Sequence, residues 1–277
     1  MSVVINVFTY ILCVSTFIQF CDQQLLINVQ NQGGDVLQET ISANVSEDVV
    51  TLEFQRSDGT LITQLVDFRH EVMILKTLVL GEEERGQSQY QVMCFLSHIN
   101  KDEFISSDAM AKLRQKNPGT IRVAEMNRGQ ANLTMDLQVD VPRSVVISKH
   151  VVPLCNEAAD STYTRLHDIN TWSSLPGASL INLMSAVKHL PNSNNIDLSS
   201  SKHKTHTRCM NTMELWAPCT CQLELCIGWY PCGLKYCKSA SSKLVDSSYR
   251  CGIKTCKKCY MFRYHVKQKQ FCLWDEV

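Results

Sequence analysis

Cysteine is the residue type in this sequence best suited to do chemistry, and it is concentrated near one end. The chain of 277 residues contains 14 cysteines. A short segment this rich in cysteine is usually held together by disulfides or by metal ions. Ten of the cysteines lie between residues 209 and 272: Cys209, Cys219, Cys221, Cys226, Cys232, Cys237, Cys251, Cys256, Cys259 and Cys272.

A zinc site is the alternative to disulfides in this segment. It would use the pairs Cys219/Cys221 and Cys256/Cys259, but only the second pair has the spacing of a zinc knuckle. One zinc ion would use only some of the ten cysteines, so several metals would have to bind to use them all. We therefore expect the ten to pair among themselves. Each bridge typically contributes about 2–4 kcal/mol, so five can replace a large core. His203 and His206 are typical of solvated loop histidines, and we predict no metal and no cofactor.

The start of the chain predicts entry into the secretory pathway. Residues 1–21 carry no charge and are mostly apolar, which is typical of a signal peptide. Cleavage near Cys21 would leave twelve cysteines, an even number that permits full pairing. The alternative is an uncleaved signal anchor, because the apolar run is near the lower length limit for a membrane span. Glycosylation sequons at Asn44 and Asn132 fit a secreted, extracellular protein.

Enzymatic motifs are missing from the sequence. It contains no Gly-x-Ser-x-Gly, no His-Glu-x-x-His, no phosphate loop and no dinucleotide fingerprint, so we predict that the protein is not an enzyme. Asp67 is the one acidic residue that we single out. A carboxyl buried in a sheet would have a raised pKa and would respond to pH. The alternative is an Asp that caps a turn through backbone N–H groups.

Charge is unevenly spread, although the net charge is zero. Residues 202–277 carry thirteen Lys and Arg against five Asp and Glu, and the preceding residues carry fourteen against twenty-two. A basic half can dock on an anionic glycan, or the two halves can simply attract each other. We expect an extracellular protein or an anionic glycan as the partner, with no nucleic acid and no membrane span after signal cleavage.

The elements that must position these residues begin with a series of strands. Apolar alternation predicts strands at 25–29, 49–54, 61–68, 72–80 and 90–96. Asp58-Gly59 predicts a tight hairpin turn between the second and third of these strands. The order and the short connections indicate an antiparallel meander.

Helical and strand patterns alternate after the meander. Ser106 to Lys116 predicts a helix with an N-cap, residues 133–141 predict a half-buried strand, and residues 153–172 predict a second helix. Polar residues 173–207 follow as a linker. Within the last part, residues 208–277, two short strands are expected at 223–230 and 260–266.

Residues 22–172 resemble a BRICHOS domain. The resemblance rests on Asp67-Phe68 after a strand, Cys94 in a later strand, and Cys155 in the second helix. It implies a disulfide between Cys94 and Cys155, and a sheet covered by helices. The fold class expected is therefore α+β: an antiparallel or mixed sheet with two flanking helices, followed by a small disulfide-rich C-terminal module. Several members of that family are chaperones against β-aggregation.

The chain as a whole resembles the out at first protein family, which is secreted and has a poorly defined biochemical role. Cys226 and Cys259 depart from the family pattern, which indicates an additional pair. The strings that carry the resemblance are Leu80-Gly81-Glu82, Gly86-Gln87-Ser88-Gln89, Ala109-Met110-Ala111-Lys112-Leu113-Arg114-Gln115-Lys116-Asn117-Pro118, Trp229-Tyr230-Pro231-Cys232, Leu234-Lys235-Tyr236-Cys237, Tyr249-Arg250-Cys251-Gly252-Ile253 and Cys272-Leu273-Trp274-Asp275-Glu276.

Taken together, the sequence predicts a secreted, non-enzymatic extracellular binding or signalling protein, with a developmental role as one interpretation. The alternative hypothesis is a BRICHOS-type chaperone that caps β-prone segments in the secretory pathway. The expected organisation is a signal peptide at 1–21, a BRICHOS-like domain at 22–172, a linker at 173–207 and a cysteine-rich domain at 208–277.

Overall fold

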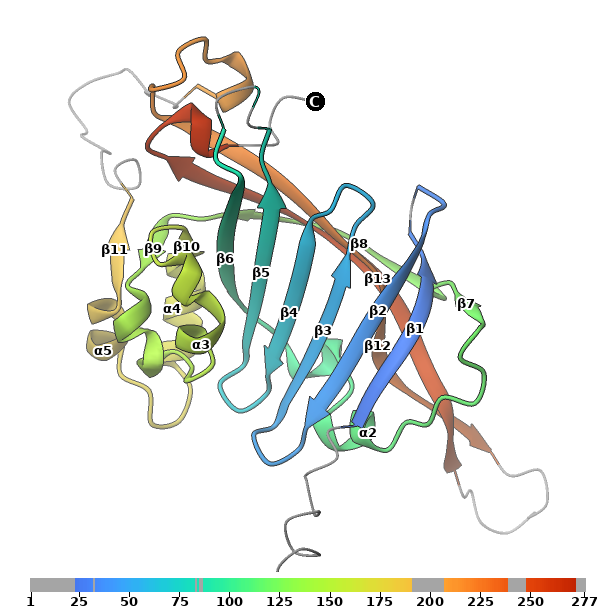
Figure 1. Ribbon diagram of the computed structural model, residues 1–277. Helices are drawn as coiled ribbons and strands as arrows, with labels where there is room; N and C mark the ends of the chain where they lie inside the picture. Colours follow the sequence, from blue (N-terminus) through green and yellow to red (C-terminus); the bar gives the residue numbers. More distant parts are fainter. Residues whose placement is uncertain are drawn as a thin grey trace, which may run out of the picture.

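The first part of the chain is an antiparallel meander of six strands (Figure 1). The computed structural model describes residues 23–31, 33–82, 84, 87–190, 207–238 and 248–272. The predicted strands and the Asp58-Gly59 hairpin are confirmed, with Gly59 at a φ of 86°. The six strands are β1 (Gln23–Gln30), β2 (Val36–Asn44), β3 (Val49–Gln55), β4 (Leu61–Asp67), β5 (Val72–Leu80) and β6 (Tyr90–His98).

Strand β2 was not predicted, for a reason that lies in its buried face. Leu37, Glu39, Ile41 and Ala43 form the inward row, so a carboxylate stands among apolar side chains. Glu39 interrupts the alternation by which a half-buried strand is recognised. Pairing with β1 and β3 on both sides fixes the strand despite this residue.

Four short strands extend the meander to ten. The sheet order is β11-β9-β10-β6-β5-β4-β3-β2-β1-β7. The pairs β10–β6 and β1–β7 are parallel, and the others are antiparallel. The added strands are β7 (Ile121–Arg122), β9 (Leu137–Val139), β10 (Thr162–Thr164) and β11 (Val187–His189).

The cysteine-rich end forms two long strands. We call the antiparallel pair β12 (Cys219–Lys238) and β13 (Ser248–Val266) the ribbon. Strand β8 (Met126–Thr134) pairs in parallel with β13 and completes a three-stranded sheet. The ribbon crosses one face of the ten-stranded sheet diagonally (Figure 1). The expected strands at 223–230 and 260–266 are therefore present, but each is part of a strand more than twice as long.

The strand predicted over residues 133–141 divides between the two sheets. Strand β8 ends at Thr134, and β9 begins at Leu137 in the ten-stranded sheet. Between them, the backbone N–H of Met135 donates to the carbonyl of Arg263, 2.7 Å away. An unbroken apolar alternation thus conceals the point where the chain passes from one layer to the other.

Two hydrophobic cores cover opposite faces of the ten-stranded sheet. The first lies between this sheet and the ribbon, where Phe95 stacks on Phe262 with ring centroids 4.1 Å apart and Phe104 stacks on Tyr230 at 5.4 Å. The second lies under short helices at the β4–β6 end and contains Ile74, among other residues.

The expected α+β fold with two flanking helices is wrong. The protein is mostly β, and one sheet face is covered by the ribbon, with the short helices between residues 141 and 185 gathered on the other (Figure 1). The described helices are η2 (Lys101–Glu103), α2 (Ser107–Ala111), η3 (Val141–Val146), α3 (Val151–Cys155), η4 (Asn156–Ala158), α4 (Leu166–Ser173), α5 (Leu180–Ser185), η5 (Cys209–Asn211) and η6 (Lys269–Phe271).

The predicted helix at 153–172 is broken by a strand. Residues Thr162–Thr164 leave the helix and form β10, which pairs with Cys94 and Phe95 of β6. Its β-branched and aromatic residues suit a strand, and pairing at the sheet edge outweighs the helical spacing of the apolar residues around it. The predicted helix 106–116 likewise ends early, at Ala111.

Some predicted segments lie outside the described residues. These are the signal peptide at 1–21, His203 and His206, and residues 191–206 of the predicted linker, which are not described. Among the described residues, no helix has the length and apolar character needed to cross a bilayer.

Candidate functional site

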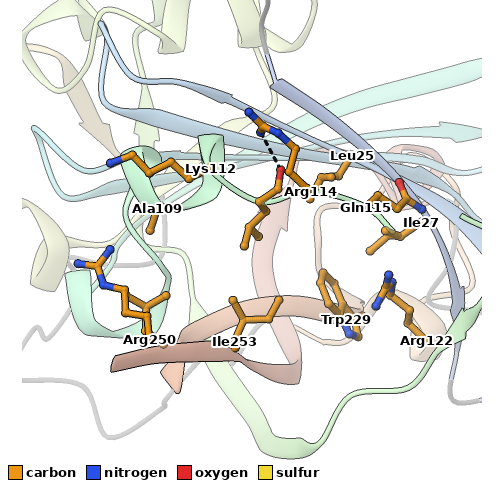
Figure 2. Close-up of a pocket in the computed structure, with 13 residues that line it drawn as sticks. Leu25, Ile27, Ala109, Lys112, Arg114, Gln115, Arg122, Trp229, Arg250 and Ile253 are labelled. Carbon is orange, nitrogen blue, oxygen red and sulfur yellow. Dashed lines mark hydrogen bonds between the residues drawn. The ribbon is translucent and has the colours of Figure 1, made fainter. Parts of the chain in front are cut away.

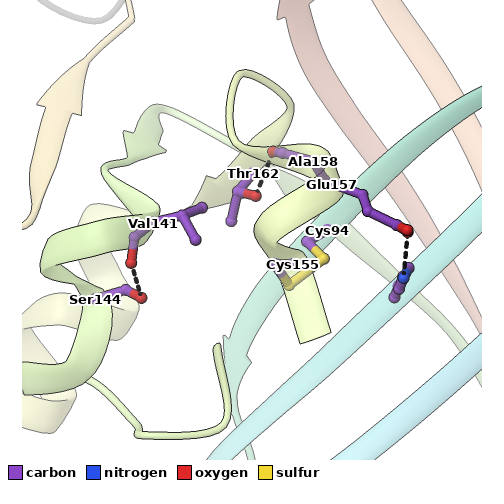
Figure 3. Close-up of a disulfide and its surroundings, with 8 residues drawn as sticks. Cys94, Val141, Ser144, Cys155, Glu157, Ala158 and Thr162 are labelled. Atoms are coloured by element: carbon purple, nitrogen blue, oxygen red, sulfur yellow. Dashed lines mark hydrogen bonds and ion pairs between the residues drawn. A yellow bond between two sulfur atoms is a disulfide. The ribbon is translucent and has the colours of Figure 1, made fainter. Parts of the chain in front are cut away.

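Twelve cysteines form six disulfides in the structure. Cys94 in β6 bonds to Cys155 in α3, which fixes the helical layer to the sheet (Figure 3), and this is the pairing implied by the BRICHOS resemblance. The ten cysteines of the C-terminal part pair among themselves: Cys209–Cys219, Cys221–Cys272, Cys226–Cys259, Cys232–Cys256 and Cys237–Cys251. The last three cross the ribbon from β12 to β13.

Three cysteine sulfur atoms lie as close together as the ligands of a metal ion would. The sulfurs of Cys209, Cys221 and Cys272 lie within 4.8 Å of one another. Each is bonded to another sulfur, and the ligand that zinc requires is a thiolate. This group is therefore a meeting point of two disulfides and does not have the chemistry of a zinc site.

Asp67 is buried at the end of β4, 1% exposed, and its carboxylate is fully engaged. One oxygen accepts from the backbone N–H groups of Arg69 and His70, at 3.0 and 3.1 Å. The other accepts from the Ser148 hydroxyl at 2.7 Å and lies 2.7 Å from Nδ1 of His70. Burial acts to raise the pKa of Asp67, but these hydrogen bonds outweigh it and the pKa is lowered. The expectation of a raised pKa is wrong, and the turn-capping geometry is present.

The two sequons occupy different settings. Asn44 is half-buried at the end of β2, and its side-chain oxygen accepts from the Ser46 hydroxyl at 2.7 Å. Asn132 is exposed on β8, as is Thr134. Within the described residues, β8 pairs only with β13, so Asn132 stands on an edge strand.

A pocket of about 400 Å³ opens between β1, the segment after α2, and the ribbon. Leu25 and Ile27 of β1 form one wall, and Trp229 and Ile253 of the ribbon form the opposite wall (Figure 2). The complete lining is Leu25, Ile27, Ala109, Lys112, Leu113, Arg114, Gln115, Arg122, Trp229, Leu234, Arg250, Gly252 and Ile253. It contains four cationic side chains and no acidic one.

The four cations of the pocket differ in how far they are already neutralised. Lys112 forms an ion pair with Asp108 at 2.6 Å, and Arg114 donates to the backbone carbonyls of Ala111 and Leu113. Arg122 and Arg250 make no ion pair within the described part of the chain. The Nε atom of Arg122 is also shielded from solvent and has no hydrogen-bond partner there. Arg122 and Arg250 are therefore the two cations of the pocket whose charge no ion pair within the described residues offsets.

Three separate local structures bring these cations together. Ser106 caps α2 by accepting from the N–H of Ala109, and the helix ends at Ala111, so Lys112 is its C-cap residue and Arg114 follows outside the helix. Arg122 lies in the two-residue strand β7, which pairs with Asn28 and Val29 of β1. Arg250 lies near the start of β13.

The pocket was not predicted from the sequence, which assigned none of its four cations to a binding site. Basic residues at every second position from Lys112 to Lys116 are the local signal. It does not identify Arg250, which reaches the pocket only because the ribbon folds over β1.

Part of the excess positive charge of the C-terminal half is used inside the molecule. Lys235 pairs with Glu125 at 2.5 Å, and Lys258 pairs with Glu103 at 2.8 Å. Both pairs join the ribbon to segments of the acidic half. Ion pairs between the two halves are therefore present. Within the described residues, Arg250 does not take part in one.

Comparison with known proteins places the chain in a family. A family model described as Out at first matches residues 23–172, and one described as Out at first, C-terminal matches residues 208–276. No solved structure matches.

Two curated relatives carry the same name. The Out at first protein of Drosophila virilis is 57% identical over 264 residues, which cover 92% of this chain and 83% of the relative. The Out at first protein of Drosophila melanogaster is 55% identical over 267 residues, which cover 93% of this chain but 53% of the relative, so the match spans about half of that protein. The chain therefore belongs to the Out at first family.

Proposed function

We propose that this protein is a secreted, non-enzymatic binding protein that captures an anionic extracellular ligand in the pocket beneath the ribbon, in a developmental role. The single observation that carries the proposal is Arg122, a guanidinium that makes no ion pair within the described residues and lines a pocket with four cations and no acid. A guanidinium in this state favours a carboxylate, sulfate or phosphate group, because two parallel N–H groups can donate to two oxygens.

Secretion is supported by the uncharged start of the sequence and by the disulfides. Six bridges within one chain are typical of an oxidising compartment. The intact mass of the full-length gene product recovered from the culture medium, with and without reduction, tests this part. We expect loss of residues near 1–21, six disulfides, and glycan mass at Asn44, Asn132 or both. Retention in the cell with free thiols would contradict it.

The chaperone hypothesis gains no support from the sheet. A chaperone of that kind would present a sheet face to its client, but the ribbon covers one face of the meander with an aromatic core. Short helices cover part of the other face. We therefore retain the binding function alone.

The test of the binding function uses two anionic probes of different kinds: anilinonaphthalene sulfonate, which is small and partly apolar, and heparin. We expect saturable binding of at least one probe to the secreted protein, weakened by added salt. The double variant R122Q/R250Q should bind it at least about tenfold more weakly, which corresponds to the loss of one charge-assisted contact.

The matched control is R56Q. Arg56 is an exposed residue in the β3–β4 turn and does not line the pocket. Its variant removes one positive charge and should bind like the native protein. Equal affinity of native protein and R122Q/R250Q for both probes would contradict the proposed function.

A further inference from the structure

The pocket has two facing apolar walls as well as cations. Leu25 and Ile27 face Trp229 and Ile253 across it (Figure 2). Three of its apolar side chains, Leu113, Leu234 and Ile253, are only partly buried, so apolar surface remains available inside the pocket. Sugar hydroxyls placed against these walls would lose hydrogen bonds to water without replacement, whereas methylene groups would gain by leaving water.

The size and shape of the pocket also favour a small molecule over a polymer. Its volume of about 400 Å³ is within the range of roughly 300–1,000 Å³ that is usual for small-molecule sites. Polyanionic glycans are bound by exposed rows of basic residues. In this pocket the cations are separated instead: Figure 2 shows Lys112 and Arg250 toward one end and Arg122 at the other, with Ile253 and Trp229 between them.

Arg122 provides the site for a head group. Its guanidinium lines the pocket and makes no ion pair within the described residues, and the two terminal nitrogens of a guanidinium form a fork that a carboxylate fits in two parallel hydrogen bonds. The indole of Trp229 is 3% exposed and stands next to Arg122 in Figure 2. A charged group bound here would be next to an apolar surface on the same side of the pocket.

We propose, building on the anion-binding function above, that the ligand is a single-chain amphiphile with a carboxylate head group, that is, a long-chain fatty acid. The carboxylate binds to Arg122, and the alkyl chain lies between the wall of Leu25 and Ile27 and the wall of Trp229 and Ile253. The methylene stems of Lys112 and Arg250 cover the chain toward the opening, with their charged ends in water.

The experiment measures binding of palmitate to the full-length secreted protein by displacement of a fluorescent fatty acid. Three competitors are compared: palmitate, palmityl alcohol and heparin. We expect palmitate to displace the probe at least about tenfold better than the alcohol, and heparin to displace none. R122Q should reduce palmitate affinity by at least about tenfold, and I253D should abolish binding because it places a carboxylate against the chain.

The control variant R56Q should bind palmitate as the native protein does. Each variant is compared at equal secreted yield and equal unreduced mass, so that a loss of binding is not a loss of folding. If palmityl alcohol bound with the same affinity as palmitate, Arg122 would not be the head-group site.

The two proposals fail in different ways. If palmitate does not bind but heparin binds in a manner that R122Q weakens, the anion-binding function stands and the amphiphile inference is wrong. If R122Q changes the binding of neither ligand, both proposals are wrong. Palmitate binding that depends on Arg122 and Ile253 supports both.

Discussion

Two buried carboxyl groups, Asp67 and Glu39, have pKa values shifted in opposite directions. Both are 1% exposed, so burial acts to raise the pKa of each. The carboxylate of Asp67 has four close polar contacts, and its pKa is lowered. Glu39 has a carboxylate oxygen without a hydrogen-bond partner, and its pKa is raised to about 8. Hydrogen bonding to the charged form, more than the depth of burial, separates the two residues.

The variant D67N should lower the free energy of unfolding by about 1–3 kcal/mol at neutral pH, because a hydrogen-bonded carboxylate is lost from a buried site. The folded-state pKa of Asp67 lies below the ordinary value of 3.8, so its stabilisation is present above that pH and is lost as the pH falls through the folded pKa. The difference between native protein and D67N should therefore shrink below about pH 4. Urea unfolding between pH 3 and pH 7 measures it.

A difference that stays constant over this range would contradict the predicted contribution of Asp67. The variant S148A is the companion measurement, because it removes one donor to the carboxylate and leaves the charge in place. It should raise the pKa of Asp67 and cost less stability than D67N.

The variant E39Q should stabilise the protein with the opposite pH dependence. Glu39 keeps its proton in the folded state up to about pH 8 and releases it near 4.5 when unfolded, so native stability falls as pH rises between these values. Glutamine is neutral throughout. The variant should match the native protein near pH 4 and exceed it by roughly 2–4 kcal/mol at pH 7. Equal stabilities at pH 7 would show that Glu39 titrates normally.

At the scale of elements, the ribbon is a long hairpin whose cysteines follow the strand alternation. Cys219, Cys221, Leu223, Leu225 and Ile227 occupy every second position of β12 and are all buried in the first core. Cys226, on the other face, pairs directly with Cys259 of β13. The cysteines that cross-link this segment therefore also follow the alternation of a strand.

The ribbon comes closest to the ten-stranded sheet at Gly228. A Cβ atom at this position would lie 3.3 Å from Cγ1 of Val29 and 3.8 Å from the carbonyl oxygen of Gln30. Glycine therefore suits this position because an added side chain would press on the Val29 side chain, at a point where the ribbon register shifts.

The variant G228V should push the ribbon away from β1 and lower the free energy of unfolding by about 1–3 kcal/mol, the usual cost of overpacking. Urea unfolding at neutral pH measures the effect. The matched control is G119A, because Gly119 has no neighbour within 4 Å of an added Cβ and should tolerate it. Equal stability of G228V and native protein would mean that the ribbon does not approach β1 this closely.

At the scale of the whole molecule, the two parts matched by the two family models share one core. Strand β8, from the first part, is the parallel neighbour of β13 in the second, and the ring of Phe95 stacks on that of Phe262. The residues between the sheets, such as Val50, Leu52 and Met73, are buried by the ribbon.

Residues 23–190 without the ribbon should therefore fail to form a soluble monomer. The first core would be open to water over the face of the meander, and β8 would lose the strand that it pairs with. We expect aggregation in size-exclusion chromatography, or strong binding of anilinonaphthalene sulfonate without cooperative unfolding. A monomeric fragment with a sharp unfolding transition would contradict the shared core.

The sequence by itself determined the local features whose signals are short in range. Alternating apolar residues predicted five of the six meander strands, Asp58-Gly59 predicted the β3–β4 hairpin, and cysteine clustering predicted a disulfide framework. Each of these depends on residues that are neighbours in the chain, so no knowledge of the fold is needed.

Only the tertiary structure decided the layer arrangement and the pocket. The apolar alternation over residues 133–141 continues although the chain changes from one sheet to the other. The helical spacing over residues 153–172 is interrupted because β10 pairs with β6. Strand β2 was not predicted because Glu39 interrupts its apolar alternation. The pocket joins Arg122 to Arg250 across more than a hundred residues. The ribbon supplies one apolar wall of the pocket and closes it over β1, and burial is a property of the folded chain that local patterns do not contain.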